Sequence, residues 1–134
     1  EDIFPTFLEM ANLKEQARKS PDGVSFMSLL TGEGTYKTDR PIYWHYPNTY
    51  DQPPYSVVRK GDWKLIYHHV DRKLELFNLT DDISEENDLF AENQQKVKEL
   101  AQLLSDHLVD TGGQMPIDKV TGNPVEYPID ILQN

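Results

Sequence analysis

The sequence contains no cysteine. Disulfide bonds and thiolate metal sites are therefore excluded, but the compartment is not fixed, because secreted bacterial proteins often lack disulfides too. The sequence also lacks an apolar run near the roughly 18 residues that a membrane-spanning helix needs. No signal peptide is recognisable. The chain begins at Glu1 rather than Met, so we expect it to be processed or excised from a longer protein.

Basic residues are few and scattered. The 134 residues include 13 Lys and Arg against 23 Asp and Glu, which gives a net charge of −10. Because phosphate contacts need a basic face, this balance disfavours nucleic acid and anionic membrane surfaces as partners. Hydrophobic residues make up 37% of the chain. That share allows a modest core, marginally stable unless another surface covers its faces.

An aromatic-rich run between Arg40 and Leu79 holds both tryptophans and most of the tyrosines. Alternating apolar residues and turn signals predict strands at residues 41–46, 55–59, 62–68 and 73–79. Lys60-Gly61 is a two-residue hairpin signal. On the strand at 62–68, the alternation places Trp63, Leu65 and Tyr67 on one face.

Three segments are predicted to be helices, the first and the last of them from their apolar periodicity. They are Ile3–Lys14, a short helix at 26–30 between a Ser25 cap and Gly32, and residues 93–110, whose stripe includes Leu100 and Leu104,. We therefore predict an α+β fold: a small antiparallel sheet of three to four strands with the long C-terminal helix packed on one face.

We expect residues 1–134 to form a single domain. Its parts are a helical lead-in at 1–34, the sheet at 40–79, the helix at 93–110 and an extended tail at 114–134 that runs over a surface. Within the lead-in, Ser20-Pro21-Asp22-Gly23 is a turn signal in which the glycine supplies a positive φ.

Candidate metal and modification sites have simpler explanations. His68 and His69 are adjacent on a strand and point to opposite faces, so they are not expected to chelate one ion together. The acidic segment 80–88 lacks the glycine of a calcium loop and is expected to be a turn with capping carboxylates. Asn78-Leu79-Thr80 matches a glycosylation sequon, a pattern short enough to arise by chance.

The sequence offers no catalytic constellation. Ser56 lies on a predicted strand without a Gly-x-Ser-x-Gly elbow, and the glycines at 32 and 34 lack the Lys-Ser/Thr of a phosphate loop. No residue is therefore predicted to be catalytic, and none to bind a metal.

Aromatic residues surround the proline-flanked loop after the first strand, which makes this loop a candidate binding site. Core packing is the expected role of Trp44, and its alternate neighbour Tyr46 shares its face. His45 points to the opposite face and could bind a ligand, because histidine titrates and hydrogen-bonds near neutral pH. His45, Tyr46 and Tyr50 are the predicted substrate-binding residues.

The chain resembles the C-terminal subdomain of sulfatases along nearly its whole length. The resemblance is carried by the order and spacing of several motifs: Asp2-Ile3-Phe4-Pro5-Thr6 with Ala11-Asn12, Asp22-Gly23-Val24-Ser25-Phe26, Trp44-His45-Tyr46-Pro47, Val57-Val58-Arg59 with Gly61-Asp62-Trp63-Lys64-Leu65, Glu75-Leu76-Phe77-Asn78-Leu79, and Asp81-Asp82 with Asn87. Asn12 stands where the family usually has glycine, and the acidic motif lacks its proline.

The resemblance implies a parent enzyme of the arylsulfatase type with an alkaline-phosphatase-like fold. Such enzymes hydrolyse sulfate esters with a formylglycine made from Cys or Ser in a Cys/Ser-x-Pro-x-Arg motif, and they bind calcium. This motif is absent here, so the chain alone is expected to be inactive and to hold no cofactor. The family's subdomain flanks the substrate cleft, and the histidine of the Trp-His-Tyr-Pro motif, here His45, can face the substrate.

The expected partners follow from the same resemblance. They are the N-terminal catalytic domain of the parent sulfatase and, through it, a sulfated small molecule or glycan, in a secreted or periplasmic setting. Two alternatives remain open: a stand-alone carbohydrate-binding module that uses Trp44, Tyr46 and Tyr50, and a structural interaction module that buries a large apolar face.

Overall fold

The computed structural model of the protein describes residues 1–13, 15, 23–36 and 39–133. The chain divides into two compact units, Glu1–Thr38 and Asp39–Asn134, and each unit is described by itself. The single domain expected from the sequence stays a prediction.

The first unit contains helices α1 (Ile3–Met10) and α3 (Met27–Thr31), which contact each other. Buried Thr6 joins them, because its hydroxyl oxygen accepts the backbone N–H of Phe26 at 3.0 Å. Asp2 adds two links, since its carboxylate accepts the backbone N–H of Val24 and the hydroxyl of Tyr36. Polar contacts between neighbouring segments therefore hold this unit together.

The ends of these helices follow local chemistry. Asn12 and Gly32 have φ angles of 59° and 71°, the left-handed conformation that ends helices,. The hydroxyl of Ser25 accepts the N–H of Met27, but the N-cap of α3 is Phe26 and not Ser25 as predicted. Space is limited at Gly23. Glycine is required there because a Cβ would lie 2.3 Å from the carbonyl oxygen of Glu1. The rest of the predicted 20–23 turn lies outside the described residues.

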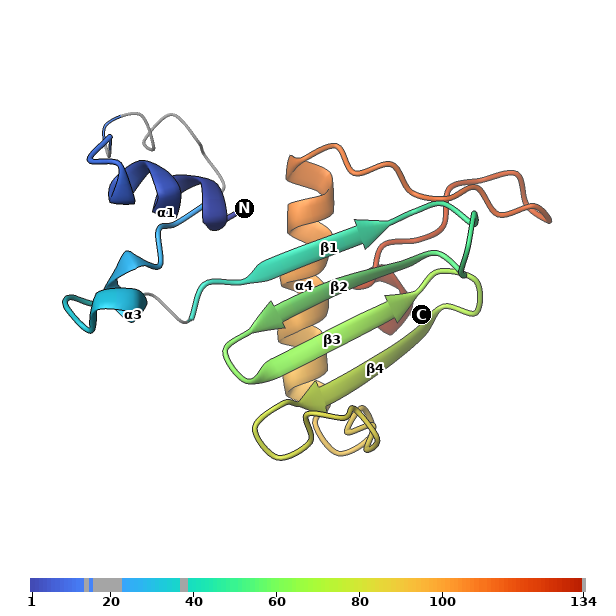
Figure 1. The fold of residues 1–134 in the computed structure, drawn as a ribbon. Coiled ribbons are helices and arrows are strands. Elements are labelled where there is room, and N and C mark those ends of the chain that lie inside the picture. Colours follow the sequence, from blue (N-terminus) through green and yellow to red (C-terminus); the bar gives the residue numbers. More distant parts are fainter. Residues whose placement is uncertain (14, 16–22, 37–38, 134) are drawn as a thin grey trace. The chain divides into compact units, whose positions relative to one another are not determined.

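The second unit is built on a four-stranded antiparallel sheet with its strands in sequence order (Figure 1). The strands are β1 (Ile42–Tyr46), β2 (Tyr55–Lys60), β3 (Trp63–His68) and β4 (Lys73–Asn78). The predicted sheet is confirmed. The β2–β3 turn differs by one residue from the prediction, because Lys60 pairs with Trp63 and the two turn residues are Gly61 and Asp62.

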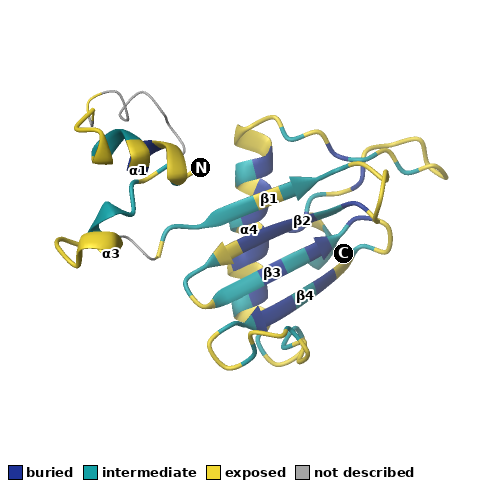
Figure 2. Cartoon of the chain, in the orientation of Figure 1, coloured by how far each residue is buried: buried dark blue, intermediate teal, exposed yellow. Residues whose placement is uncertain are grey.

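Helix α4 (Gln94–Asp110) packs on one face of the sheet, against β2 and β3, as predicted. The stripe read from the sequence is its buried face: Val97, Leu100, Ala101, Leu104 and Leu108 are at most 1% exposed. From the sheet, alternate residues of the central and last strands complete this core: Val58, Leu65, Tyr67, Leu74 and Leu76. Figure 2 shows the buried positions on both layers.

The opposite sheet face is not covered by α4, and we call it the open face. The strand register places Trp44, Val57 and Ile66 side by side on it. Trp44 is 48% exposed, so its predicted core role is wrong. The alternation of β1 was read correctly, but α4 covers the side that carries Tyr43 and His45.

The tail after α4 contributes to the core. Met115, Val125, Pro128 and Ile129 are buried in it, although the sequence predicted only a run over the surface. An isolated bridge pairs Ile117 with Pro124, and a short 3-10 helix spans Asp130–Leu132. The tail is therefore a packed hairpin-like segment that covers the end of the core.

Candidate functional site

The three predicted substrate-binding residues do not meet on one surface. His45 is half-buried on the sheet face that α4 covers. Tyr46 lies on the open face, where its ring stacks on Tyr55 with centroids 5.7 Å apart. Tyr50 lies in the loop between β1 and β2 and is 89% exposed. Only Tyr50 is thus fully presented to solvent.

His45 belongs instead to a chain of hydrogen bonds that crosses the sheet. Its Nδ1 lies 2.8 Å from the hydroxyl oxygen of Ser56, and the same oxygen lies 2.8 Å from Nε2 of His69. The other nitrogen of His45, Nε2, lies 3.0 Å from the carbonyl oxygen of Gln114. The chain therefore links β1, β2, the end of β3 and the start of the tail.

The chemistry of the acceptors fixes the protons in this chain. A carbonyl oxygen only accepts, so Nε2 of His45 carries a hydrogen. In a neutral His45, Nδ1 is then an acceptor, and the hydroxyl of Ser56 donates to it. The Ser56 oxygen is left to accept from the Nε2–H of His69. When both imidazoles are neutral, each is an Nε2–H tautomer and every bond has one donor.

His69 lies in an environment that disfavours charge. It is 1% exposed, and its Nδ1 has no hydrogen-bond partner among the described residues. Burial, together with the imidazoles of His45 and His68, lowers the pKa of His69 to about 4,. The ring of Tyr67 packs against it at 4.9 Å, and burial raises the pKa of that phenol above its ordinary range. His69 is therefore neutral at physiological pH.

Ser56 is fully buried between these two histidines. A buried hydroxyl cannot reach an external substrate, so its contact with two imidazoles does not make it a nucleophile. A pocket of about 410 Å³ lies beside these hydrogen bonds. Its lining includes His69, Pro54, Val125 and the ion-paired Arg72 and Asp118. Arg72 also bonds Glu126 and so ties the β3–β4 turn to the tail.

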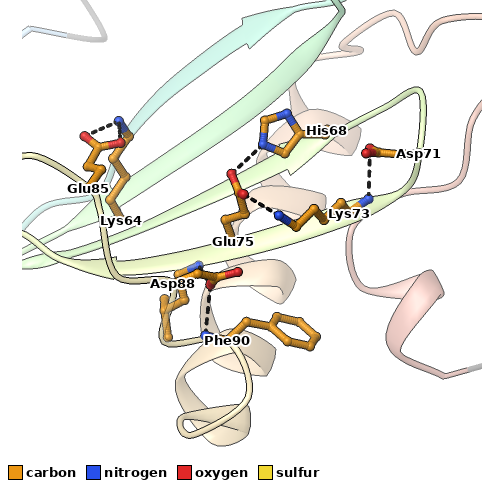
Figure 3. A network of polar contacts seen from close by, with 9 residues as sticks. Lys64, His68, Asp71, Lys73, Glu75, Glu85, Asp88 and Phe90 are labelled. Atoms are coloured by element: carbon orange, nitrogen blue, oxygen red, sulfur yellow. Dashed lines mark hydrogen bonds and ion pairs between the residues drawn. The ribbon is translucent and has the colours of Figure 1, made fainter.

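Charged side chains occupy the end of the open face near the β3–β4 turn (Figure 3). Glu75 accepts from His68 at 2.7 Å and from Lys73 at 2.5 Å, and mainly the bond from Lys73 lowers its pKa. At the opposite end of this face, Lys64 contacts Glu85 of the loop after β4 at 2.7 Å. His68 thus faces away from His69, as predicted. These groups neutralise one another.

The acidic turn has its carboxylates bound to the backbone. Asp82 accepts the N–H groups of Glu86 and Asn87, which lowers its pKa. Asp88 accepts from Leu76 and Phe90, which binds this loop to the β4 edge (Figure 3). The predicted capping turn is confirmed, and these residues do not fit a calcium site. Within the described ranges, no three His, Asp or Glu residues gather as metal ligands.

Sequence reasoning missed Ser56 and His69 as partners of His45. The available signal was the parity of the strands, because His45 and Ser56 face the same side once β1 and β2 pair. That pairing depends on a register across an eight-residue loop, which the sequence alone does not determine.

Comparisons with known proteins agree on one family. The family described as "N-sulphoglucosamine sulphohydrolase, C-terminal" matches residues 1–114. A sulfatase of Formosa agariphila is 35% identical over 118 residues, which are 80% of this chain and 21% of that protein. A choline-sulfatase of Rhizobium meliloti is 31% identical over 69% of this chain and 17% of its own length.

The fold is shared with solved structures. BT4656, solved in complex with its substrate D-glucosamine-2-N,6-O-disulfate, superposes with a TM-score of 0.64 at 29% identity, over 88% of this chain and 25% of that one. The chain thus spans about a sixth to a quarter of the length of these proteins. No helix among the described residues is long and apolar enough to cross a bilayer.

Proposed function

The chain belongs to the C-terminal domain family of N-sulphoglucosamine sulphohydrolase, and from this premise we propose that it supports and flanks the active site of an enzyme that hydrolyses sulfate esters. The observation that carries the proposal is the match over residues 1–114, joined to coverage of only 21% of the Formosa sulfatase. The alkaline-phosphatase-like catalytic domain of that enzyme precedes this chain, and the chain alone turns over no substrate.

Calcium and formylglycine belong to that N-terminal catalytic domain in this proposal. The chain has no cysteine and no Ser-x-Pro-x-Arg sequence from which formylglycine could be made. Asp82 is bound to backbone N–H groups. The residues present therefore do not fit either group, and no chemical step is assigned to them.

The open face is the surface proposed to contact the catalytic domain. Trp44 is 48% exposed, and its neighbour Ile66 is only partly buried although α4 lies on the other side of the sheet. Large apolar side chains gathered on one face are typical of an interface. In the first unit, the exposed apolar residues of α1, Ile3, Phe4 and Phe7, offer a second contact of the same kind.

We infer that the substrate is a sulfated sugar, in particular a sulfated glucosamine. The support is the description of the matched family together with the substrate bound in the BT4656 structure. His45, Tyr46 and Tyr50 are proposed to flank the cleft. Tyr50 is exposed enough to contact a sugar directly. Both ring nitrogens of His45 already form hydrogen bonds. His45 could therefore bind a substrate only if its bond to the Gln114 carbonyl were broken.

A second candidate function is carbohydrate binding by the chain itself, favoured by the exposure of Trp44 and Tyr50,. Binding of a sulfated glycan to the 134-residue chain, lost in Trp44→Ala with the fold intact, would support it. Absence of binding would leave the enzyme subdomain as the function.

The test of substrate class uses the chain joined to the catalytic domain that precedes it in its reading frame. D-glucosamine-2-N,6-O-disulfate and choline sulfate are offered at equal concentration, and released sulfate is measured. We expect the sugar to be hydrolysed at least tenfold faster. Equal rates, or preference for choline sulfate, would overturn the assignment to sugars, and no release from any sulfate ester would overturn the enzyme class.

A further inference from the structure

The hydrogen-bond chain from His69 to Gln114 contains as many hydrogens as bonds. Its bonds join Nε2 of His69 to Ser56, Ser56 to Nδ1 of His45, and Nε2 of His45 to the carbonyl of Gln114. With both histidines neutral, one hydrogen on each imidazole and one on the serine fill these bonds. Nothing is left over except the lone pair on Nδ1 of His69, which is buried.

Wherever a further proton binds among His45, Ser56 and His69, one N–H or O–H group is left without an acceptor. On His69, the new N–H at Nδ1 faces no partner. On His45, the new Nδ1–H must donate to Ser56. The serine hydroxyl then either donates to Nε2 of His69, which moves the hydrogen of that ring to the partnerless Nδ1, or is itself left without an acceptor. Each arrangement buries one unsatisfied donor, a costly outcome in a protein interior.

We propose that His45, Ser56 and His69 form a proton-sensitive clamp: in its neutral state the clamp binds the tail to β1 through the carbonyl of Gln114, and the first proton it takes up leaves one buried donor without an acceptor. The clamp resists protonation because the group left without an acceptor, on His69 or Ser56, is buried. Acid therefore acts first on the bonds at Ser56, whereas the Nε2–H of a protonated His45 can still donate to the carbonyl of Gln114.

The surroundings give little compensation for a positive charge. The aromatic ring of Tyr67 packs on His69, and its hydroxyl is already bonded to the backbone carbonyl of Glu126. The imidazole of the neighbouring residue, His68, disfavours a positive charge on His69. From the tail and the β3–β4 turn, Arg72 and Asp118 line the same pocket but neutralise each other.

The remaining groups near His45 lie on β1 and α4. Tyr43, two residues away on the same face, stacks on His107 with ring centroids 3.8 Å apart, and burial and Asp106 raise the pKa of Tyr43. A neutral phenol stacked on an imidazole offers no carboxylate to a protonated His45. The prediction is consistent with the lowered pKa of His69, of about 4.

The test is nitrogen-15 NMR of the imidazoles, with the carbonyl carbon of Gln114 as reporter of its bond, between pH 7.5 and 4. At pH 7.5 both His45 and His69 should be Nε2–H tautomers. On acidification, the chemical shifts of both rings and of the Gln114 carbonyl should change together. Their common midpoint should lie at least about one pH unit below that of a free histidine. An Nδ1–H tautomer of His69, separate midpoints, or an ordinary midpoint would overturn the proposal.

Variants separate the clamp from general stability. Ser56→Thr keeps the hydroxyl and should keep the common midpoint, whereas Ser56→Ala should give the two rings independent midpoints. Ser105→Ala, which removes a different buried hydroxyl, should leave the common midpoint of the two rings unchanged although it lowers stability. If Ser56→Ala does not fold, the tautomers and midpoint of the unsubstituted chain decide the matter alone.

Discussion

The hydroxyl oxygen of Ser105 on α4 accepts the backbone N–H of Ile129 at 3.0 Å, and both residues are buried. Helix α4 therefore packs against the sheet through its buried stripe and also holds the tail in place through Ser105. This contact predicts that Ser105→Ala lowers the free energy of unfolding by about 1–3 kcal/mol, because the N–H of Ile129 loses its acceptor. Urea unfolding measures it, with exposed Ser84→Ala as a control expected to stay within about 0.5 kcal/mol. A loss no greater than that of the control would show that water replaces the hydroxyl.

The close approach of Gly23 to Glu1 predicts a local effect in the first unit. Gly23→Ala places a Cβ 2.3 Å from a backbone oxygen, so residues 1–8 and 23–31 must separate. Gly32→Asn is the matched control, since Gly32 has open space around it and asparagine tolerates its φ of 71°,. Amide hydrogen exchange at Phe26, which donates to Thr6, should quicken in the first variant only. Unchanged exchange at Phe26 in Gly23→Ala would contradict the crowding argument.

The neutral state of His69 predicts a loss of stability in acid. Its pKa is about 4 in the folded chain and near 6.5 when unfolded, so the unfolded chain binds more protons between these values,. The stability that His69 contributes is thus fully present above pH 6.5 and is lost as the pH falls towards 4.

His69→Gln keeps a donor near Ser56 but does not titrate. Between pH 7 and 4.5, the unsubstituted chain should lose about 2 kcal/mol more of its free energy of unfolding than this variant, as measured with urea. Comparing the two chains cancels the carboxylate titrations that they share. Parallel pH profiles would mean that His69 is already protonated, or equally exposed, in the folded chain.

The proposed role of the open face predicts an effect that depends on context. In the 134-residue chain Trp44→Ser should change the free energy of unfolding by about 0.5 kcal/mol or less, because Trp44 is 48% exposed,. In the protein joined to its catalytic domain, the same change should lower the thermal midpoint of the chain clearly more than Val120→Ser does. Val120, at 94% exposure, is the control. Equal effects in both contexts would place the catalytic domain on another surface.

The sequence was sufficient where structure is local. The spacing of Leu100, Ala101, Leu104 and Leu108 identifies the buried side of α4, because a 3.6-residue period needs no knowledge of the partner,. Alternation likewise separates Leu65 and Tyr67 from Ile66. The left-handed cap at Gly32 follows from residue chemistry,.

The sequence was insufficient where long-range packing decides. Alternation could not tell which face of β1 the helix covers, so Trp44 was assigned to the core and His45 to a ligand. The burial of Met115 and Val125 was hidden by prolines and by the absence of periodicity in the tail. The bond between His45 and Ser56 depends on a strand register that a slip of one residue would abolish.

The most direct test of the sulfatase subdomain assignment is release of sulfate from an aryl sulfate in the presence of calcium. It is measured for the 134-residue chain alone and for the chain joined to the segment that precedes it in its reading frame. We predict release only from the joined protein, whose preceding segment should carry a Cys/Ser-x-Pro-x-Arg motif, and none above buffer from the chain alone. Turnover by the isolated chain, or an inactive joined protein without such a motif, would contradict the assignment.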